Sequence, residues 1–211
     1  MNTLAYVLLA LALVAAIVDW VAVVDDDIGL EYLCKPLTVV LLILAALALE
    51  PDDPSVRAWF VVALVCSLAG DVFLMLKDRD LFVPGLASFL LAHLAYVAGF
   101  VTGGVDSVRL AVGVVVAVAA IAAVGTRIVN TTQEKAPELV VPVTVYMGVI
   151  SAMLVFAVGS GNGVAIAGAL LFYVSDALIG WSRFVKDFRW ARPAIMVTYH
   201  LAQAALVWSL V

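Results

Sequence analysis

The stretch 167-AGALLFYVSDALIGW-181 holds a single carboxylate, Asp176, in the middle of an apolar run. An earlier stretch, 64-LVCSLAGDVFLML-76, has the same character around Asp71. An ionisable side chain inside a membrane segment costs about 3 kcal/mol on insertion scales, and it usually faces a bundle interior or a wet cavity. Two such side chains favour a functional site. The alternative is that each carboxylate only hydrogen-bonds a neighbouring helix.

The composition of the chain is that of a protein with almost no soluble part. Of its 211 residues, 66% are hydrophobic and 13% are charged, and the mean hydropathy is +1.18; a soluble domain carries about 25% charged residues. We therefore predict an all-α polytopic membrane protein in which residues 1–211 form one integral membrane domain. The net charge of −5 argues against a nucleic-acid partner, and no obligate protein partner is evident. The two cysteines are too few for a disulfide framework, and no Cys/His cluster has the spacing of a zinc site.

Eight segments are long and apolar enough to cross a membrane, which needs about 20 residues in a helix. They are Leu4–Val24, Tyr32–Leu49, Ala58–Leu76, Phe82–Val101, Val108–Val129, Leu139–Gly159, Val164–Trp181 and Ala191–Val211. Short connections with Pro, Gly and Asp separate them, and none could hold a domain. Any active site must therefore lie within the helix bundle.

The basic residues predict the orientation of this bundle. Nine of the 11 Lys and Arg residues fall at the loops after the first, third, fifth and seventh helices. These are Lys35, Lys77, Arg79, Arg127, Lys135, Arg183, Lys186, Arg189 and Arg192. Because cytoplasmic loops are enriched in Lys and Arg, we expect these loops in the cytoplasm, both termini outside, and a multi-pass protein of the plasma (inner) membrane.

The two halves of the chain resemble each other. Asp71 lies six residues before Lys77 and Asp176 lies seven before Arg183, which places both about 9–10 Å from the same membrane face at about 1.5 Å per residue. The following helices carry His93 in AHLAY and His200 in YHLAQ. We therefore predict a parallel repeat of two four-helix halves with the site at their interface. Chance similarity between apolar strings is the alternative.

Other polar side chains are expected at the same depth. Tyr173 lies one turn before Asp176 and shares its face, and Tyr146, Tyr199 and His200 lie on neighbouring helices. Lys35 could pair with a lipid phosphate or with a carboxylate, or it could be an ordinary interfacial lysine. Tyrosines and histidines in membrane bundles often serve only as hydrogen-bonding groups between helices.

The chain resembles the YhhN family, the lysoplasmalogenases, in a set of residues that follow the order of the family's motifs. The matching residues are Lys35-Pro36-Leu37, Gly70-Asp71-Val72-Phe73-Leu74-Met75-Leu76, Gly85, Phe89, His93, Tyr96, Tyr146, Gly168-Ala169-Leu170-Leu171-Phe172, Ser175-Asp176, Tyr199 and Gln203. His200 departs from the family pattern. The resemblance implies hydrolysis of the vinyl ether bond of lysoplasmalogens, so the partners would be a lysophospholipid substrate and the membrane lipids. It also implies that Asp71 and Asp176 are the catalytic residues, and it implies no metal or cofactor.

The residues suit that chemistry. Vinyl ether hydrolysis needs an acid, a base for water and negative charge near an oxocarbenium ion, and paired carboxylates supply these in glycosidases. Two close carboxyls can share one proton, so one aspartate could act as acid and the other as base. The products would be a fatty aldehyde and glycerophosphoethanolamine or glycerophosphocholine. Lys35, His93, Tyr96, Tyr146, Tyr173, Tyr199 and His200 are the expected substrate-binding or orienting residues.

Two other classes of protein would also use buried aspartates. A small transporter could bind protons or cations with them at the interface of the repeat. An intramembrane aspartyl protease is disfavoured, because its Gly-X-Gly-Asp motif is replaced here by Leu68-Ala69-Gly70-Asp71.

Overall fold

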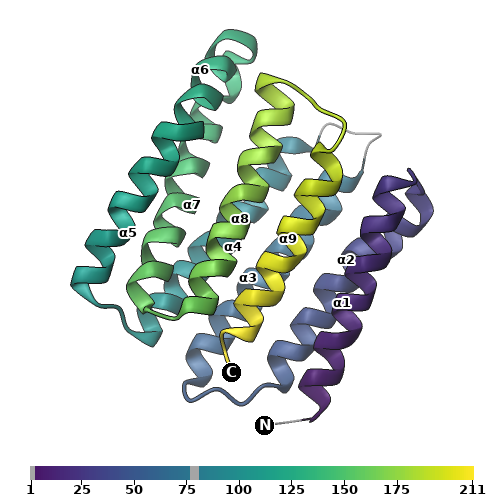
Figure 1. The fold of residues 1–211 in the computed structure, drawn as a ribbon, viewed down its shortest axis with the longest axis vertical. Coiled ribbons are helices and arrows are strands. Elements are labelled where there is room, and N and C mark those ends of the chain that lie inside the picture. The colour runs from purple at the N-terminus through teal and green to yellow at the C-terminus, as the bar shows by residue number, and fades with distance from the viewer. Residues whose placement is uncertain (1–2, 77–80) are drawn as a thin grey trace.

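The computed structural model describes residues 3–76 and 81–211, and these form one bundle of helices (Figure 1). The long helices are α1 (Thr3–Val24), α2 (Ile28–Ala48), α3 (Pro54–Met75), α4 (Phe82–Gly103), α5 (Ser107–Ala120), α6 (Thr126–Lys135), α7 (Val140–Ser160), α8 (Gly163–Gly180) and α9 (Ala191–Trp208). A π-helical turn η1 (Ile121–Gly125) joins α5 to α6, a short 3-10 turn η2 (Pro137–Leu139) precedes α7, and a second π-helical turn η3 (Trp181–Val185) ends α8.

The prediction of an all-helical, multi-pass bundle is confirmed. Within the described residues, seven continuous helical segments are long and apolar enough to cross a membrane, and α5, η1 and α6 together make one of them. The eighth predicted segment is α9, which has 18 residues and is less apolar because it carries Arg192, His200 and Gln203. The predicted connection at Lys77–Asp80 lies outside the described residues.

Several helix boundaries differ from the prediction, and N-caps explain two of them. The second helix starts at Ile28 because the Asp27 side chain accepts a hydrogen bond from the Leu30 N–H at 3.1 Å. The third starts at Pro54 because Asp53 accepts from the Ser55 N–H at 2.7 Å. An aspartate at this position satisfies backbone donors that have no partner inside the helix. The acidic loops thus begin their helices earlier than hydropathy alone indicates.

Small residues bring the helices close together. Ala5, Ala45 and Ala46 are fully buried and belong to the core that α1 and α2 share. On α3, a Cβ at Gly70 would lie 2.6 Å from the ring of Phe89 on α4, so only glycine lets this ring lie on the α3 backbone. Close approach of this kind is the usual basis of helix packing in membranes, where burial of apolar surface provides little driving force.

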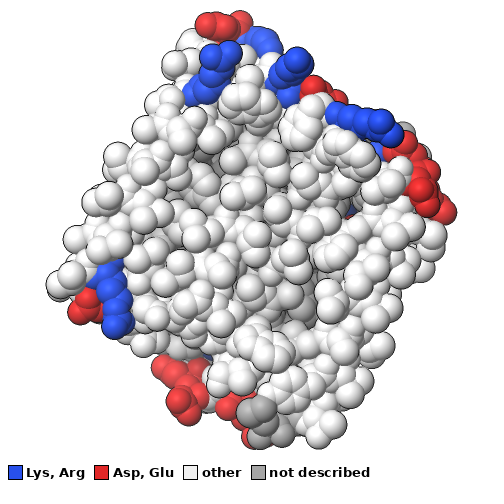
Figure 2. Space-filling model, viewed as in Figure 1, with Lys and Arg blue, Asp and Glu red and all other residues white. Residues whose placement is uncertain are grey.

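The packing pattern agrees with the predicted repeat. In the first half α1 packs on α2 and α3 on α4, and in the second half α5 packs on α7 and α8 on α9. Two contacts in equivalent positions join the halves, since α4 packs on α7 and α9 packs on α2, and α9 also packs on α1 and α3. Both termini lie at one end of the bundle (Figure 1), and most of the Lys and Arg visible in Figure 2 gather at the opposite end.

Candidate active site

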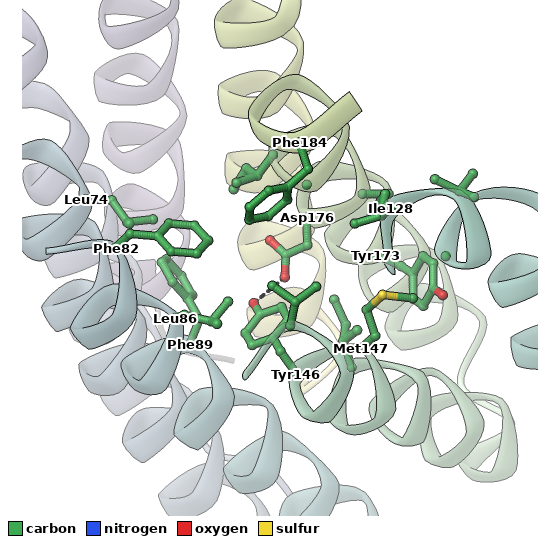
Figure 3. Close-up of a pocket in the computed structure, with 17 residues that line it drawn as sticks. Leu74, Phe82, Leu86, Phe89, Ile128, Tyr146, Met147, Tyr173, Asp176 and Phe184 are labelled. Carbon is green, nitrogen blue, oxygen red and sulfur yellow. Dashed lines mark hydrogen bonds between the residues drawn. The ribbon is translucent and has the colours of Figure 1, made fainter. Parts of the chain in front are cut away.

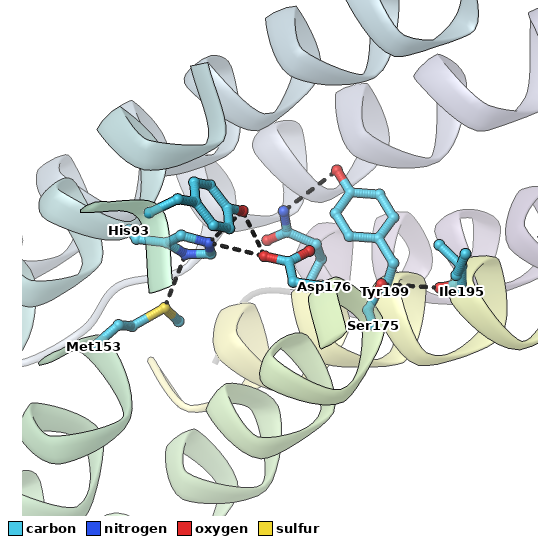
Figure 4. A network of polar contacts seen from close by, with 8 residues as sticks. His93, Met153, Ser175, Asp176, Ile195 and Tyr199 are labelled. Atoms are coloured by element: carbon cyan, nitrogen blue, oxygen red, sulfur yellow. Dashed lines mark hydrogen bonds and ion pairs between the residues drawn. The ribbon is translucent and has the colours of Figure 1, made fainter. Parts of the chain in front are cut away.

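Asp176 on α8 is the centre of a polar cluster that three helices build. The Tyr146 hydroxyl on α7 donates to Asp176 Oδ2 at 2.5 Å, and Nε2 of His93 on α4 lies 3.1 Å from the same oxygen (Figure 4). Nε2 also lies 2.9 Å from the Tyr146 oxygen. Because Tyr146 has one proton and donates it to Asp176, we place a proton on His93 Nε2, from where it is shared between the two oxygens. The other ring nitrogen of His93 faces the sulfur of Met153 at 3.2 Å.

Asp176 and Tyr146 lie at the wall of an apolar cavity of about 700 Å³, counting the part that opens to the surroundings (Figure 3). Leu74, Phe82, Leu86, Phe89, Val124, Gly125, Ile128, Val143, Met147, Ile150, Tyr173, Ala177, Ile179, Gly180 and Phe184 complete the lining. Tyr173 lies beside Met147 with its hydroxyl directed away from Asp176 (Figure 3). A large apolar cavity with a few convergent polar groups is typical of a small-molecule site.

Asp71 on α3 belongs to a second polar cluster. Its Oδ1 lies 3.3 Å from the ammonium nitrogen of Lys35 on α2, and its Oδ2 accepts a hydrogen bond from the Tyr199 hydroxyl on α9 at 2.6 Å. The Gln203 amide donates to the Tyr199 oxygen at 3.4 Å, and the Tyr96 hydroxyl donates to Gln203 Oε1 at 2.5 Å. Lys35 and Asp71 are both buried, so the predicted lysine pairs with a carboxylate.

Aromatic rings separate the two clusters. Phe172 contacts His93 on one side and Tyr199 on the other, with ring centroids 4.7 and 5.5 Å apart. Asp71 is 1% exposed and does not line the cavity, whereas Asp176 does. The two aspartates therefore lie in different surroundings, one sealed and one open to the cavity.

The two clusters have equivalent places in the repeat. Asp71 contacts the second helix of its own half through Lys35 and the last helix of the other half through Tyr199. Asp176 contacts the second helix of its own half, α7, through Tyr146, and the last helix of the other half, α4, through His93. This equivalence supports the predicted site at the interface of the halves.

His200 lies away from both aspartates. It faces α1, where the Trp20 indole N–H donates to His200 Nδ1 at 3.0 Å and Asp19 Oδ2 lies 3.9 Å from the same nitrogen. The similarity between the two histidine strings aligns His200 with His93, but on α9 it is the preceding residue, Tyr199, that faces Asp71.

Asp19 on α1 is a further buried carboxylate, and it was not singled out in the sequence analysis. It is 0% exposed, and its two oxygens have no hydrogen-bond partner among the described residues. Its signal is the same as that of Asp71, a lone acid within an apolar helix. Within the described ranges, no three His, Cys, Asp or Glu side chains are placed to hold a metal ion together.

Comparison with known proteins shows the family to which the chain belongs. A sequence model of the YhhN family matches residues 30–210, which include both aspartates and leave out α1. The human protein named lysoplasmalogenase TMEM86B is 37% identical over 70% of this chain and 61% of its own length. The lysoplasmalogenase of Mycobacterium bovis is 33% identical over 68% of this chain and 56% of its own, and the bovine lysoplasmalogenase TMEM86A is 30% identical over 84% and 76%. The chain thus spans less than two thirds of the length of the human TMEM86B and mycobacterial relatives. No solved structure matches it.

Proposed function

Since this chain belongs to the YhhN family, we propose that it is a hydrolase that cleaves the vinyl ether bond of lysoplasmalogens in the membrane. The substrates would be lysoplasmenylethanolamine or lysoplasmenylcholine. The products would be a fatty aldehyde and glycerophosphoethanolamine or glycerophosphocholine. The names of its relatives support this reaction.

The position of Asp176 carries the proposal. It is a carboxyl group at the wall of a cavity that is lined almost entirely by apolar side chains, which suits a hydrocarbon chain beside a reacting polar bond. The described hydrogen bonds to this carboxyl both fall on Oδ2. Oδ1 is therefore the oxygen that we assign to proton exchange with the substrate.

Asp176 can supply both the acid and the base of the reaction. The protonated carboxyl gives its proton from Oδ1 to the β-carbon of the vinyl ether, and the double bond becomes an oxocarbenium ion. The new carboxylate stabilises that cation, as in glycoside hydrolysis. Water then adds to the α-carbon and returns a proton to Asp176. The hemiacetal transfers its hydroxyl proton to the glycerol oxygen as the C–O bond breaks, so that one water is consumed and an aldehyde leaves.

We assign Asp71 to positioning. Its contacts with Lys35 and Tyr199 join α2, α3 and α9. The Tyr199 ring packs against Phe172, and Phe172 packs against His93. Asp71 therefore acts on the reaction through the packing of Phe172 and His93. This role differs from the pair of catalytic aspartates that the family resemblance implies.

We also propose that the protein lies in the plasma membrane with both termini outside. The cavity would then open toward the cytoplasmic leaflet, because Lys135 at the end of α6 and the basic residues in and after η3 belong to the end at which Phe82 and Phe184 line it. Cytoplasmic ends of membrane helices are enriched in Lys and Arg.

The test is release of aldehyde from a lysoplasmenyl lipid by the purified protein in detergent. We expect release by the wild type, a loss of at least about 100-fold in Asp176→Asn, as for removal of a general acid, and no change in Asp52→Asn, an exposed aspartate between α2 and α3. Wild-type rates in Asp176→Asn would overturn the mechanism. No release by folded wild-type protein from any head group would overturn the hydrolase.

Transport remains the second candidate, because a repeat with buried ionisable groups at its interface is typical of small transporters. Flux of a solute into proteoliposomes without any product would favour it. Aldehyde release with no flux would exclude it.

A further inference from the structure

One end of the cavity carries a cation. Phe82 at the start of α4 and Phe184 in η3 both line this end, and their rings meet edge to face with centroids 6.0 Å apart. The guanidinium carbon of Arg183 lies 3.9 Å from the centroid of the Phe82 ring. A positive charge therefore lies directly against a ring of the cavity wall, at the end that holds the basic loops.

The local structure fixes this arrangement. In η3 the Lys186 N–H donates to the Trp181 carbonyl at 3.0 Å, which closes a π-helical turn. Lys135 at the end of α6 donates to the carbonyls of Phe184 and Val185 at 2.8 and 3.2 Å. Donors of this kind satisfy the carbonyls that a helix end leaves without partners. Lys135 thereby holds the turn that presents Arg183.

We propose that Arg183 binds the phosphate of the lysophospholipid substrate while the alkenyl chain occupies the cavity. This inference rests on the proposed function and adds to it the recognition of the head group. A guanidinium stacks on a ring through its flat face, whereas it binds phosphate through the N–H groups at its edge, so the two contacts are compatible.

The distances agree with this placement. Arg183 follows Asp176 by seven residues, which is about 10 Å along a helix at about 1.5 Å per residue. In a lysoplasmalogen the vinyl ether carbon and the phosphorus are separated by about six single bonds, or roughly 7 Å at an advance of about 1.2 Å per bond along an extended chain. The difference is within the reach of an arginine side chain. A vinyl ether at Asp176 thus places the phosphate near Arg183.

Two substrates with the same reacting bond test the proposal. One is lysoplasmenylethanolamine, and the other is the 1-alkenylglycerol of the same chain length, which lacks the phosphate. In Arg183→Ala we expect KM for the phospholipid to rise about 10- to 100-fold, the usual effect of losing a hydrogen bond to a charged group, with kcat nearly unchanged. The kinetics on the alkenylglycerol should stay within about twofold of the wild type, which also shows that the variant is folded. Arg183→Lys should recover part of the loss, because it keeps the charge without the planar fork.

Arg189→Ala is the matched control, because this arginine follows η3 closely but its guanidinium carbon lies 5.2 Å from the ring of Trp190, which does not line the cavity, whereas Arg183 lies against Phe82, which does. It should behave as the wild type on both substrates. Equal effects of Arg183→Ala on the two substrates, or no effect on either, would overturn the phosphate site and leave the hydrolase standing. If the wild type cleaves neither substrate, the proposed function itself fails.

Discussion

The buried ion pair between Lys35 and Asp71 should be the most sensitive point of the bundle. Its side chains are 7% and 2% exposed, and the ammonium nitrogen lies 3.3 Å from the carboxylate oxygen. Replacing Lys35 by Met keeps most of the volume of the side chain and removes the charge. Asp71 then remains inside the bundle with Tyr199 as its described donor.

The expected size of the effect follows from this geometry. At 3.3 Å two unit charges attract by about 5 kcal/mol at an effective dielectric constant of about 20. Removing one partner of a buried pair typically costs about 3–5 kcal/mol. Because Tyr199 still stabilises the carboxylate, we expect the lower value, about 3 kcal/mol. For a protein of this size that corresponds to a fall in Tm of about 6–12 °C, at about 2–4 °C per kcal/mol.

The assay is thermal unfolding in detergent, followed by tryptophan fluorescence. Lys35→Met and Asp71→Asn should each lower Tm, and the double variant should recover most of the loss because neither charge is left without its counterpart. Lys186→Met, which removes an exposed lysine, is the control and should leave Tm unchanged. If Lys35→Met unfolds within about 2 °C of the wild type, or if the two single losses simply add in the double variant, the pair does not stabilise the bundle in the way described.

Three further substitutions test other parts of the structure. Tyr146→Phe removes the hydrogen bond to Asp176 and should lower kcat about 10- to 100-fold at unchanged Tm; an unchanged kcat would show that this contact does not serve the reaction. Ala177→Phe places a ring in the cavity and should abolish lipid cleavage without loss of Tm, so retained activity would place the substrate elsewhere. Asp19→Leu removes a buried carboxylate without a described hydrogen-bond partner and should raise the free energy of unfolding by about 1–3 kcal/mol, whereas a lower Tm would show that its contact with His200 at 3.9 Å is stabilising.

The number and type of the helices could be predicted from the sequence because each span must satisfy its own backbone hydrogen bonds and cover them with apolar side chains. The starts of α2 and α3 could not be placed from hydropathy. Asp27 and Asp53 look like loop residues on any hydropathy scale, and only their hydrogen bonds to backbone N–H groups make them N-caps. Local capping, rather than apolarity, decides where these helices begin.

Asp71 and Asp176 could be singled out from the sequence, but the side chains that contact them could not. Asp71 and Asp176 are conspicuous as charges in apolar runs, but Tyr199 lies 128 residues from the aspartate that it contacts, and His93 lies 83 residues from its own. Tyr199 and His200 are adjacent, so their side chains project about 100° apart around α9 at 3.6 residues per turn. Which of them faces Asp71 depends on how α9 is rotated against α1 and α3, and tertiary packing decides that rotation.

The two halves have a similar helix packing, but different side chains surround their aspartates. In one half the helix that precedes the aspartate helix supplies an ammonium group, Lys35, and the resulting pair is neutral as a unit and sealed from the cavity. In the other half the equivalent helix supplies the phenol of Tyr146, and His93 completes a cluster whose members all carry exchangeable protons. A carboxyl group that gives up and regains a proton during a reaction needs access to the substrate, and neighbouring side chains that can donate and accept protons favour this exchange. Of the two aspartates, only Asp176 both has Tyr146 and His93 as neighbours and lines the cavity, which is why we assign the proton transfer to Asp176 and the positioning role to Asp71.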